Sequence, residues 1–272
     1  MDNLQKYTLI TGAGGLLGKY HAEALLETGE NILLTDINYK SLIDLRNELK
    51  KSFKNLSIII EKLDITSESS IIKLIQKIKK KNLIVKTLIN NAAIDFKFKN
   101  KKDFNSKIRL ENYDLNNWTN EINVGLTGPM LCSKHFGNQM VLHKIRGLII
   151  NIGSDLSIIA PNQSIYKQKS FKENSQPVKP VTYSVIKHGI VGLTKYLSTY
   201  WAEKGVRCNC LSPGPIDQGQ NKNFLSKVKK QIPILKLAKP DDFKEAIKFL
   251  CSEKSSYMNG HNLVIDGGKS VW

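Results

Sequence analysis

Short apolar runs alternate with longer stretches of helical periodicity along the whole chain. The apolar runs have the length of strands and lie at residues 7–10, 31–35, 56–60, 85–89, 148–152, 207–211 and 262–265. Helical patterns fill the intervals, at residues 18–28, 41–50, 67–80, 115–140, 183–203 and 241–250. Strands that alternate with helices form parallel sheets covered on both faces. The sequence therefore predicts an α/β fold with a doubly wound, seven-stranded parallel sheet.

Two polar, lysine-bearing stretches interrupt this alternation, at residues 95–112 and 155–182. Both are too long for simple connections, and each follows a predicted strand. They should therefore emerge at the carboxyl edge of the sheet, where such folds bind ligands. The length of 272 residues is compatible with about two domains, but also with one large core. Since no linker or repeat divides the chain, we expect a single domain over residues 1–272.

Several classes of protein are excluded by composition. The N-terminal residues lack the basic and long apolar regions of a secretory signal, and no apolar run approaches the roughly 20 residues that span a bilayer. Four scattered cysteines do not make a disulfide scaffold, and the single-residue spacer between Cys208 and Cys210 is shorter than zinc sites use. We expect a cytoplasmic protein with reduced thiols, no metal and no membrane partner.

The net charge of +17 does not indicate a nucleic-acid partner. Only four of the 41 basic residues are arginines, and the lysines are spread over every segment. The run 77–81 follows apolar residues at helical spacing, which is typical of the solvated side of an amphipathic helix. We therefore interpret the lysines as residues on solvated faces of the protein.

A glycine-rich turn joins the first predicted strand to the first helix. Its small residues would let backbone amides and the helix dipole contact a pyrophosphate; they are Gly12, Gly14, Gly15, Leu16, Leu17 and Gly18. Asp36 ends the next strand, 18 residues after the last glycine, where a carboxylate accepts hydrogen bonds from an adenosine ribose. A carboxylate would repel a 2′-phosphate, so NAD is favoured over NADP, although Lys40 lies near in the sequence.

Together with further motifs, this turn resembles the short-chain dehydrogenase/reductase family over essentially the whole chain. The matching motifs are Asp64-Ile65, Asn90-Asn91-Ala92-Ala93, Asn123, Asn151-Ile152-Gly153-Ser154, Tyr183-Ser184-Val185-Ile186-Lys187, Pro213-Gly214 and Asp266-Gly267-Gly268. The resemblance implies a Rossmann-like fold with Asn123, Ser154, Tyr183 and Lys187 as catalytic residues. It also implies cofactor contacts from Asp64, Ile65, Asn91, Ala92, Ala93, Tyr183, Lys187, Pro213, Gly214 and Ile216.

The chain departs from the family pattern at several places. Leu16 occupies the position of the middle glycine of the loop, and Ala93 that of the glycine after Asn-Asn-Ala. The threonine that commonly follows Pro213-Gly214 is absent. The separation of 29 residues between Ser154 and Tyr183 is longer than in simple members, and this places the 155–182 insertion beside the reaction centre.

The Tyr183 and Lys187 side chains lie four residues apart, so they share one face of a helix. An unperturbed tyrosine has a pKa of about 10, and a nearby ammonium favours the phenolate. Tyr183 can then accept a proton from an alcohol or donate one to a carbonyl, while Ser154 orients the substrate oxygen. The resemblance gives Lys187 the nicotinamide ribose and gives Asn123 a water-mediated relay to Lys187. Taken singly, each of these residues has an ordinary structural interpretation; their joint order favours catalysis.

Residues outside these motifs are expected to have ordinary structural roles. Tyr166 has Ser170, not a lysine, four residues later, so we do not expect it to be the acid/base. His21 and His188 are interpreted as polar residues of helices, because Tyr183 already supplies the acid/base.

The segments expected to frame the substrate are polar and basic. They are the insertion, with Tyr166, Lys167, Lys169, Lys172 and Lys179, and a lid at residues 215–236, with Asp217, Gln218, Gln220, Asn221, Lys222, Lys227, Lys229 and Lys230. We expect a hydrophilic, sugar-like substrate, a class that includes phosphorylated and nucleotide-linked sugars. A weaker resemblance is to oxidoreductases of bacterial surface-sugar and flagellin-glycan pathways.

Two other functions stay open at this point. One is an NADPH-dependent ketoreductase acting on acyl-carrier-bound substrates, and the other is a non-catalytic dinucleotide-binding scaffold. The family resemblance implies a homodimer or homotetramer.

Overall fold

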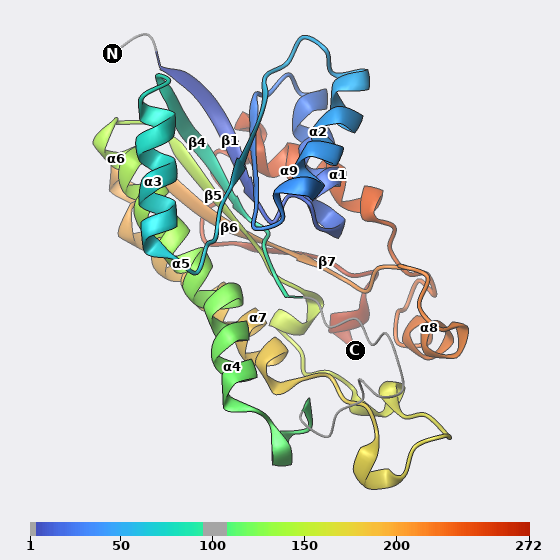
Figure 1. Cartoon of the computed structure of the whole chain (residues 1–272). Coiled ribbons are helices and arrows are strands. Elements are labelled where there is room, and N and C mark those ends of the chain that lie inside the picture. The colour runs from blue at the N-terminus through green and yellow to red at the C-terminus, as the bar shows by residue number, and fades with distance from the viewer. Residues whose placement is uncertain (1–3, 95–107) are drawn as a thin grey trace.

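A computed structural model describes residues 4–94 and 108–272, and their strands form one parallel sheet (Figure 1). The strand order is β3-β2-β1-β4-β5-β6-β7. The strands are β1 Gln5–Thr11, β2 Ile32–Asp36, β3 Ile58–Lys62, β4 Leu83–Asn90, β5 Gly147–Ile152, β6 Val206–Pro213 and β7 Asn262–Ile265. The order reverses between β1 and β4, and folds of this kind bind ligands at such a switch point. The predicted doubly wound, seven-stranded parallel sheet is confirmed.

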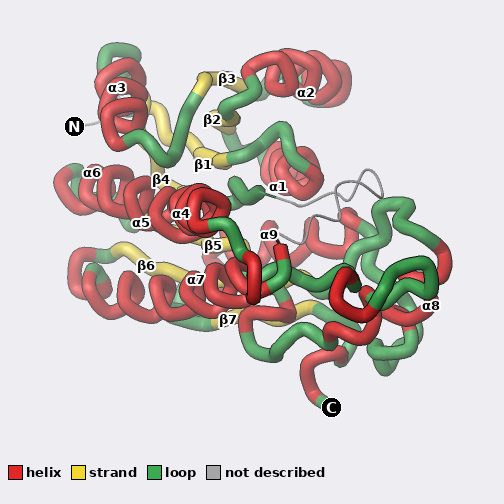
Figure 2. Tube along the Cα trace, turned by 60° about the horizontal axis from the view of Figure 1, so that its bottom comes forward, coloured by secondary structure: helices red, strands yellow, loops and turns green. Residues whose placement is uncertain are grey.

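Helices cover both faces of this sheet (Figure 2). One side carries α1 Leu16–Glu27, α2 Tyr39–Ser52 and α9 Lys244–Cys251. The other carries α3 Glu68–Lys79, α4 Leu115–Ile122, α5 Gly128–Cys132, α6 Asn138–Leu142 and α7 Val181–Tyr200. Each side has its own apolar cluster, centred on Leu25, Leu34 and Phe243 in the first case and on Leu9, Phe136 and Leu197 in the second. Burial of these side chains on both faces explains why the strands read as continuous apolar runs.

The helix expected over residues 115–140 is one long element with two irregular turns. Its α-helical parts α4, α5 and α6 are joined by π-helical turns at Asn123–Thr127 and Ser133–Gly137. Asp114 caps its start by accepting hydrogen bonds from the amides of Asn116 and Asn117. Wide turns of this type are frequent at functional sites, and the first begins at Asn123.

Some predicted boundaries differ from the structure. The third strand begins two residues later than expected, at Ile58, because the chain first completes a turn after α2. The last helix begins with a 3-10 turn, Pro240–Phe243, since a proline at the first position favours a tight start. Residues 95–107 of the first predicted insertion lie outside the described residues.

The second insertion and the predicted lid contact each other beyond the carboxyl edge of the sheet. The lid contains α8, Lys222–Lys229. The ammonium of Lys227 in α8 donates to the carbonyl of Lys167, 2.7 Å away, and the Phe224 ring lies 5.4 Å from that of Tyr166. Segments about 60 residues apart in the sequence therefore form one flank of the site.

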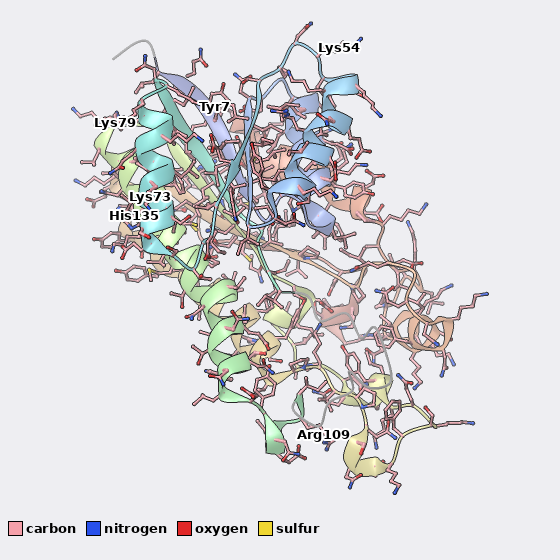
Figure 3. The ribbon with its side chains drawn as sticks, viewed as in Figure 1. Tyr7, Lys54, Lys73, Lys79, Arg109 and His135 are labelled. Carbon is pink, nitrogen blue, oxygen red and sulfur yellow. The ribbon has the colours of Figure 1, made fainter. Side chains whose placement is uncertain are left out.

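The lysines are mostly solvated, as the sequence indicates. Lys54, Lys73 and Lys79 are exposed and project outward (Figure 3). Lys77 pairs with Glu61 at 2.6 Å. Across the described part of the chain, no helix is long and apolar enough to cross a membrane, and no three His, Cys, Asp or Glu residues form a metal-binding group.

His21 does not behave as the polar helix residue expected from the sequence. It is fully buried in α1, and neither ring nitrogen has a hydrogen-bond partner among the described residues. Burial lowers the pKa of His21 to about 3, since a charged imidazole would lose its hydration. The ring is therefore neutral in the folded protein at ordinary pH.

This buried histidine predicts a loss of stability in acid. Below pH 6.5 the unfolded chain protonates His21 while the native protein does not, so the free energy of unfolding falls by about 1.4 kcal/mol per pH unit down to about pH 3. Between pH 7 and pH 4.5, we expect the free energy of unfolding of His21→Leu to fall by about 2–3 kcal/mol less than that of the wild type, as measured by urea unfolding. His188→Gln, at an exposed histidine, is the control. Parallel pH curves for His21→Leu and wild type would contradict this account.

Candidate active site

The turn after β1 is held against the turn after β4. The backbone amides of Asn91 and Ala92 donate to Thr11 Oγ1, and Asn91 Nδ2 donates to the carbonyls of Thr11 and Gly12 at 3.0 and 2.9 Å. Gly12 has a φ of +60°, and a Cβ there would lie 2.5 Å from the Cα of Ala92. Asn91 thus positions the glycine turn through its side chain.

The rest of the glycine turn brings backbone amides to the start of α1. A Cβ on Gly14 would lie 2.1 Å from Ser41 Oγ, and one on Gly18 would lie 2.4 Å from the Ala13 carbonyl. The helix begins at Leu16 without a side-chain cap, so its first amides are available at the sheet edge. Leu16 itself is 41% exposed, so its side chain is accommodated without displacing the turn.

The carboxylate of Asp36 lies beside the glycine turn. Its Oδ2 accepts from the Gly14 amide at 3.0 Å and its Oδ1 from the Asn38 amide at 2.9 Å. A carboxylate has about four acceptor sites, so capacity remains for ribose hydroxyls. After β3, Asp64 Oδ1 accepts from both the amide and the hydroxyl of Thr66, while Ile65 is buried against the helix at Gly128.

Ser154 and Tyr183 come together from elements far apart in the sequence. Ser154 follows β5, and Tyr183 lies in the first turn of α7. The Tyr183 hydroxyl donates to Ser154 Oγ at 3.3 Å. Ser154 is 5% exposed, and its oxygen also accepts from the Leu156 amide at 3.2 Å. The insertion therefore does not keep Ser154 and Tyr183 apart.

Lys187 lies one turn further along α7, beneath Tyr183. Its ammonium is 5.8 Å from the centre of the Tyr183 ring and donates to the carbonyl of Ile152, at the end of β5, at 2.9 Å. Asn123 lies in the first π-helical turn, where its Oδ1 accepts from Thr127 Oγ1 at 3.5 Å. Lys187 is thus anchored on the strand that carries Ser154.

A buried row of polar groups fastens α7 to the sheet, and sequence reasoning gave it no role. Asn90 Nδ2 donates to Asn151 Oδ1 at 2.8 Å, and Asn151 Nδ2 donates to Thr194 Oγ1 at 2.9 Å. Asn90 ends β4 and is in register with Asn151, the next-to-last residue of β5. This row fixes the position of α7 along β5, and hence the position of Tyr183.

The insertion brings two more side chains to the tyrosine. The ammonium of Lys179 lies 3.6 Å from the centre of the Tyr183 ring. Burial raises the pKa of the Tyr166 phenol, and the acidic groups of Tyr183 and Asp155 raise it further. Lys167, in contrast, pairs with Glu173 at the surface, at 2.6 Å. The sequence places the insertion with Tyr166 and Lys179 beside the reaction centre, but neither residue belongs to a motif, so their individual contacts come from the fold.

The loops after β6 and β7 complete the site. A Cβ on Gly214 would lie 2.5 Å from the Cα of Asp266, so the turn at Pro213 packs directly on the end of β7. Ile216, at the start of the lid, forms a parallel β-bridge with Ala238, just after the end of the lid. Lys269, just beyond β7, forms a buried ion pair with Asp155. No sequence signal connects these two residues, which are 114 positions apart.

The chain is similar in sequence and structure to known oxidoreductases. A family model described as Enoyl-(Acyl carrier protein) reductase matches residues 12–270. The chain is 28% identical to 2-dehydro-3-deoxy-D-gluconate 5-dehydrogenase of Bacillus subtilis, over 97% of this chain and 94% of that protein. It is 28% identical to a 3-oxoacyl-acyl-carrier-protein reductase of Buchnera aphidicola, over 97% of both chains.

A solved structure with a bound dinucleotide has the same fold. This short chain dehydrogenase from Leptospira borgpetersenii, with bound NAD+, superposes with a TM-score of 0.83 at 27% identity, covering 99% of this chain and 94% of that one. The family match spans nearly the whole sequence, and the fold agrees with it. The chain therefore belongs to the short-chain dehydrogenase/reductase family of NAD(P)-dependent oxidoreductases, which act on alcohols and carbonyls.

Proposed function

We propose that this protein is an NAD-dependent oxidoreductase that interconverts a secondary alcohol and a ketone through Ser154, Tyr183 and Lys187. The observation that carries the proposal is the contact of the Tyr183 hydroxyl with Ser154 Oγ at 3.3 Å, with the Lys187 ammonium beneath the tyrosine ring. An acid/base, an orienting hydroxyl and a cation then lie around one position for a substrate oxygen.

The glycine turn fits a dinucleotide. Gly12 and Gly14 let the turn pack closely against Ala92 and Ser41, where a Cβ would collide, and the open N-terminus of α1 offers amides to a pyrophosphate. The surface continues through the rest of the turn, at Gly15, Leu16, Leu17 and Gly18. The adenine would be bordered by Asp64 and Ile65. The nicotinamide half would be bordered by Asn91, Ala92, Ala93, Pro213, Gly214 and Ile216. When bound, the nicotinamide accepts or supplies a hydride.

The side chains of the site handle the proton. In alcohol oxidation Tyr183 takes the hydroxyl proton of the substrate, and in ketone reduction it returns a proton to the oxygen. The positive charge of Lys187 favours the phenolate form of a tyrosine near it. Ser154 holds the substrate oxygen in line with Tyr183. Asn123, at the start of the π-helical turn, is the proposed end of a relay through Lys187.

The preference for NAD rests on Asp36. Its carboxylate lies at the glycine turn, where it would bind ribose hydroxyls and repel a 2′-phosphate. We expect Asp36→Ala to weaken NADH binding about tenfold or more and to narrow the gap between NADH and NADPH. The measurement is a paired fluorescence titration of both nucleotides, using Trp118, Trp201 and Trp272 as reporters.

Asp36→Asn is the matched control for this experiment. It keeps an acceptor oxygen for one of the Gly14 and Asn38 amides but removes the charge, so it should retain more NADH affinity than Asp36→Ala while also binding NADPH better than wild type. An unchanged NADH-to-NADPH affinity ratio in both variants would overturn the assignment of Asp36.

The substrate that we propose is polar and sugar-like, including sugar acids, sugar phosphates and nucleotide-linked sugars. The flank formed by the insertion and α8 is polar and basic, and Lys179 adds a positive charge beside Tyr183. The similarity to a dehydrogenase of a deoxygluconate supports a sugar acid. Lys167 contributes less positive charge to the substrate site than the sequence suggests, because Glu173 pairs with it.

An acyl-carrier or coenzyme A substrate is the second candidate. The similarity to a 3-oxoacyl-acyl-carrier-protein reductase favours it, as does the net charge of +17, which suits an acidic carrier. Preferential binding of NADPH by the wild type would support this candidate over the sugar-like substrate.

We further propose a homodimer or homotetramer in the cytoplasm. Tyr196 and Tyr200 on α7 are stacked at 5.4 Å and each about 60% exposed, and Trp272 is 75% exposed at the C-terminal end. Exposed aromatic clusters of this kind are typical of interfaces. The free cysteines are consistent with a reducing compartment, and light scattering of the purified protein measures its assembly.

A further inference from the structure

A chain of buried polar contacts extends from Ser154 away from the substrate side. Ser154 Oγ donates to Asp155 Oδ1 at 2.8 Å, and Asp155 Oδ2 accepts from the ammonium of Lys269. The side chains of Asp155 and Lys269 are only 6% and 9% exposed. The turn Asp266–Gly268, with both glycines at positive φ, directs Lys269 back toward β5. The C-terminal segment thus reaches the serine of the proposed site.

The hydrogen bonds of Ser154 leave only one arrangement for its proton. A serine hydroxyl has one hydrogen to donate, and here the carboxylate of Asp155, which can only accept, takes it. The Leu156 amide and the Tyr183 hydroxyl both donate to the serine oxygen. The oxygen therefore presents its lone pairs to Tyr183, while the hydrogen points toward Asp155.

We propose that Asp155, held in place by Lys269, is a positioning residue that sets the orientation of the Ser154 hydroxyl. This inference rests on the proposed function, because Ser154 is the group through which Asp155 acts. Stability alone does not account for the ion pair: burying two charges is costly, and apolar side chains of similar size often serve as well. An ion pair that also orients the Ser154 hydroxyl has a role in the site that apolar side chains could not fill.

The test compares two double variants that differ only in an acceptor oxygen. Asp155→Asn with Lys269→Met keeps an oxygen for the Ser154 hydroxyl, whereas Asp155→Ala with Lys269→Met does not, and neither buries a lone charge. Both are made with Ser154 and with Ser154→Ala. NADH formation from NAD+ is measured with D-gluconate and D-glucose as probe alcohols, together with NADH affinity and unfolding temperature. Lys77→Met, which breaks the remote ion pair with Glu61, is the control.

With Ser154 present, we expect the Asn variant to be about fivefold to tenfold more active than the Ala variant, at equal NADH affinity. With Ser154→Ala the two should be equal, because Asp155 has no hydroxyl left to orient. The same ratio on both backgrounds, or no difference with Ser154, would overturn the proposal while leaving the proposed function standing. Absence of turnover by the wild type with both probes would instead count against the sugar-like substrate of the proposed function and would overturn this proposal with it.

Discussion

Replacing Tyr183 with phenylalanine is expected to lower kcat by about 10³-fold or more while leaving NADH affinity within about twofold of wild type. The change removes one oxygen, the atom that contacts Ser154 Oγ at 3.3 Å. The ring keeps its contacts with Lys179 and Lys187, so the fold and the nucleotide surface are preserved. Steady-state rates of NADH formation and a fluorescence titration measure the two quantities.

Tyr257→Phe is the matched control, because Tyr257 is fully exposed and belongs neither to the proposed site nor to the proposed interface. It should leave kcat unchanged. A Tyr183→Phe protein with wild-type turnover would remove the tyrosine from the reaction. If such a protein retained its full biological role without turnover, the non-catalytic scaffold would become the better account.

Replacing Lys187 with methionine is the second large effect. Methionine approximates the length of the lysine side chain but removes the charge beneath the Tyr183 ring and the hydrogen bond to the Ile152 carbonyl. We expect kcat for alcohol oxidation to fall about 10²-fold or more. Because a cation favours the phenolate, the pH at which oxidation reaches half its maximal rate should also rise. A pH–rate profile of the variant and the wild type measures both changes.

Lys195→Met is the control for general effects of charge removal, since Lys195 is exposed on the same helix. It should change neither the rate nor the profile. A Lys187→Met protein with a reduced rate but an unshifted profile would assign Lys187 to binding alone.

Much of the fold follows from the sequence for a simple physical reason. Strands buried on both faces carry runs of apolar residues, as in β2 and β5, and helices such as α3 carry apolar residues at a spacing of three to four. The strand order is the doubly wound arrangement expected from that alternation. Boundaries were less accurate, as at Ile58, because end residues depend on turns and tertiary contacts.

The candidate site was predictable where chemistry and spacing coincide. Tyr183 and Lys187 share a helix face, and Gly12, Gly14 and Asp36 are grouped as expected at the sheet edge. Asn91 has an additional structural task, because its amide holds the glycine turn.

The remaining features required the folded chain. The Asp155–Lys269 pair joins residues 114 positions apart, and no local pattern encodes such a contact. Tyr166 reaches the site because the insertion folds beyond the carboxyl edge of the sheet and packs on α8. The burial of His21 also escaped sequence reasoning, since histidine at that position reads as a polar residue on a helix. Each of these depends on long-range packing, which a single sequence does not display.

The activity that we propose for this chain is hydride transfer between NAD and a secondary alcohol, with Tyr183 as the acid/base. Its most direct test follows absorbance at 340 nm after the wild type or Tyr183→Phe is mixed with NAD+ and a panel of neutral polyols, sugar acids and sugar phosphates. We predict NADH formation from at least one compound by the wild type, and at least about 10³-fold less by Tyr183→Phe. Equal rates in the two proteins, or no turnover of any compound by a wild type that binds NADH saturably, would contradict the claim.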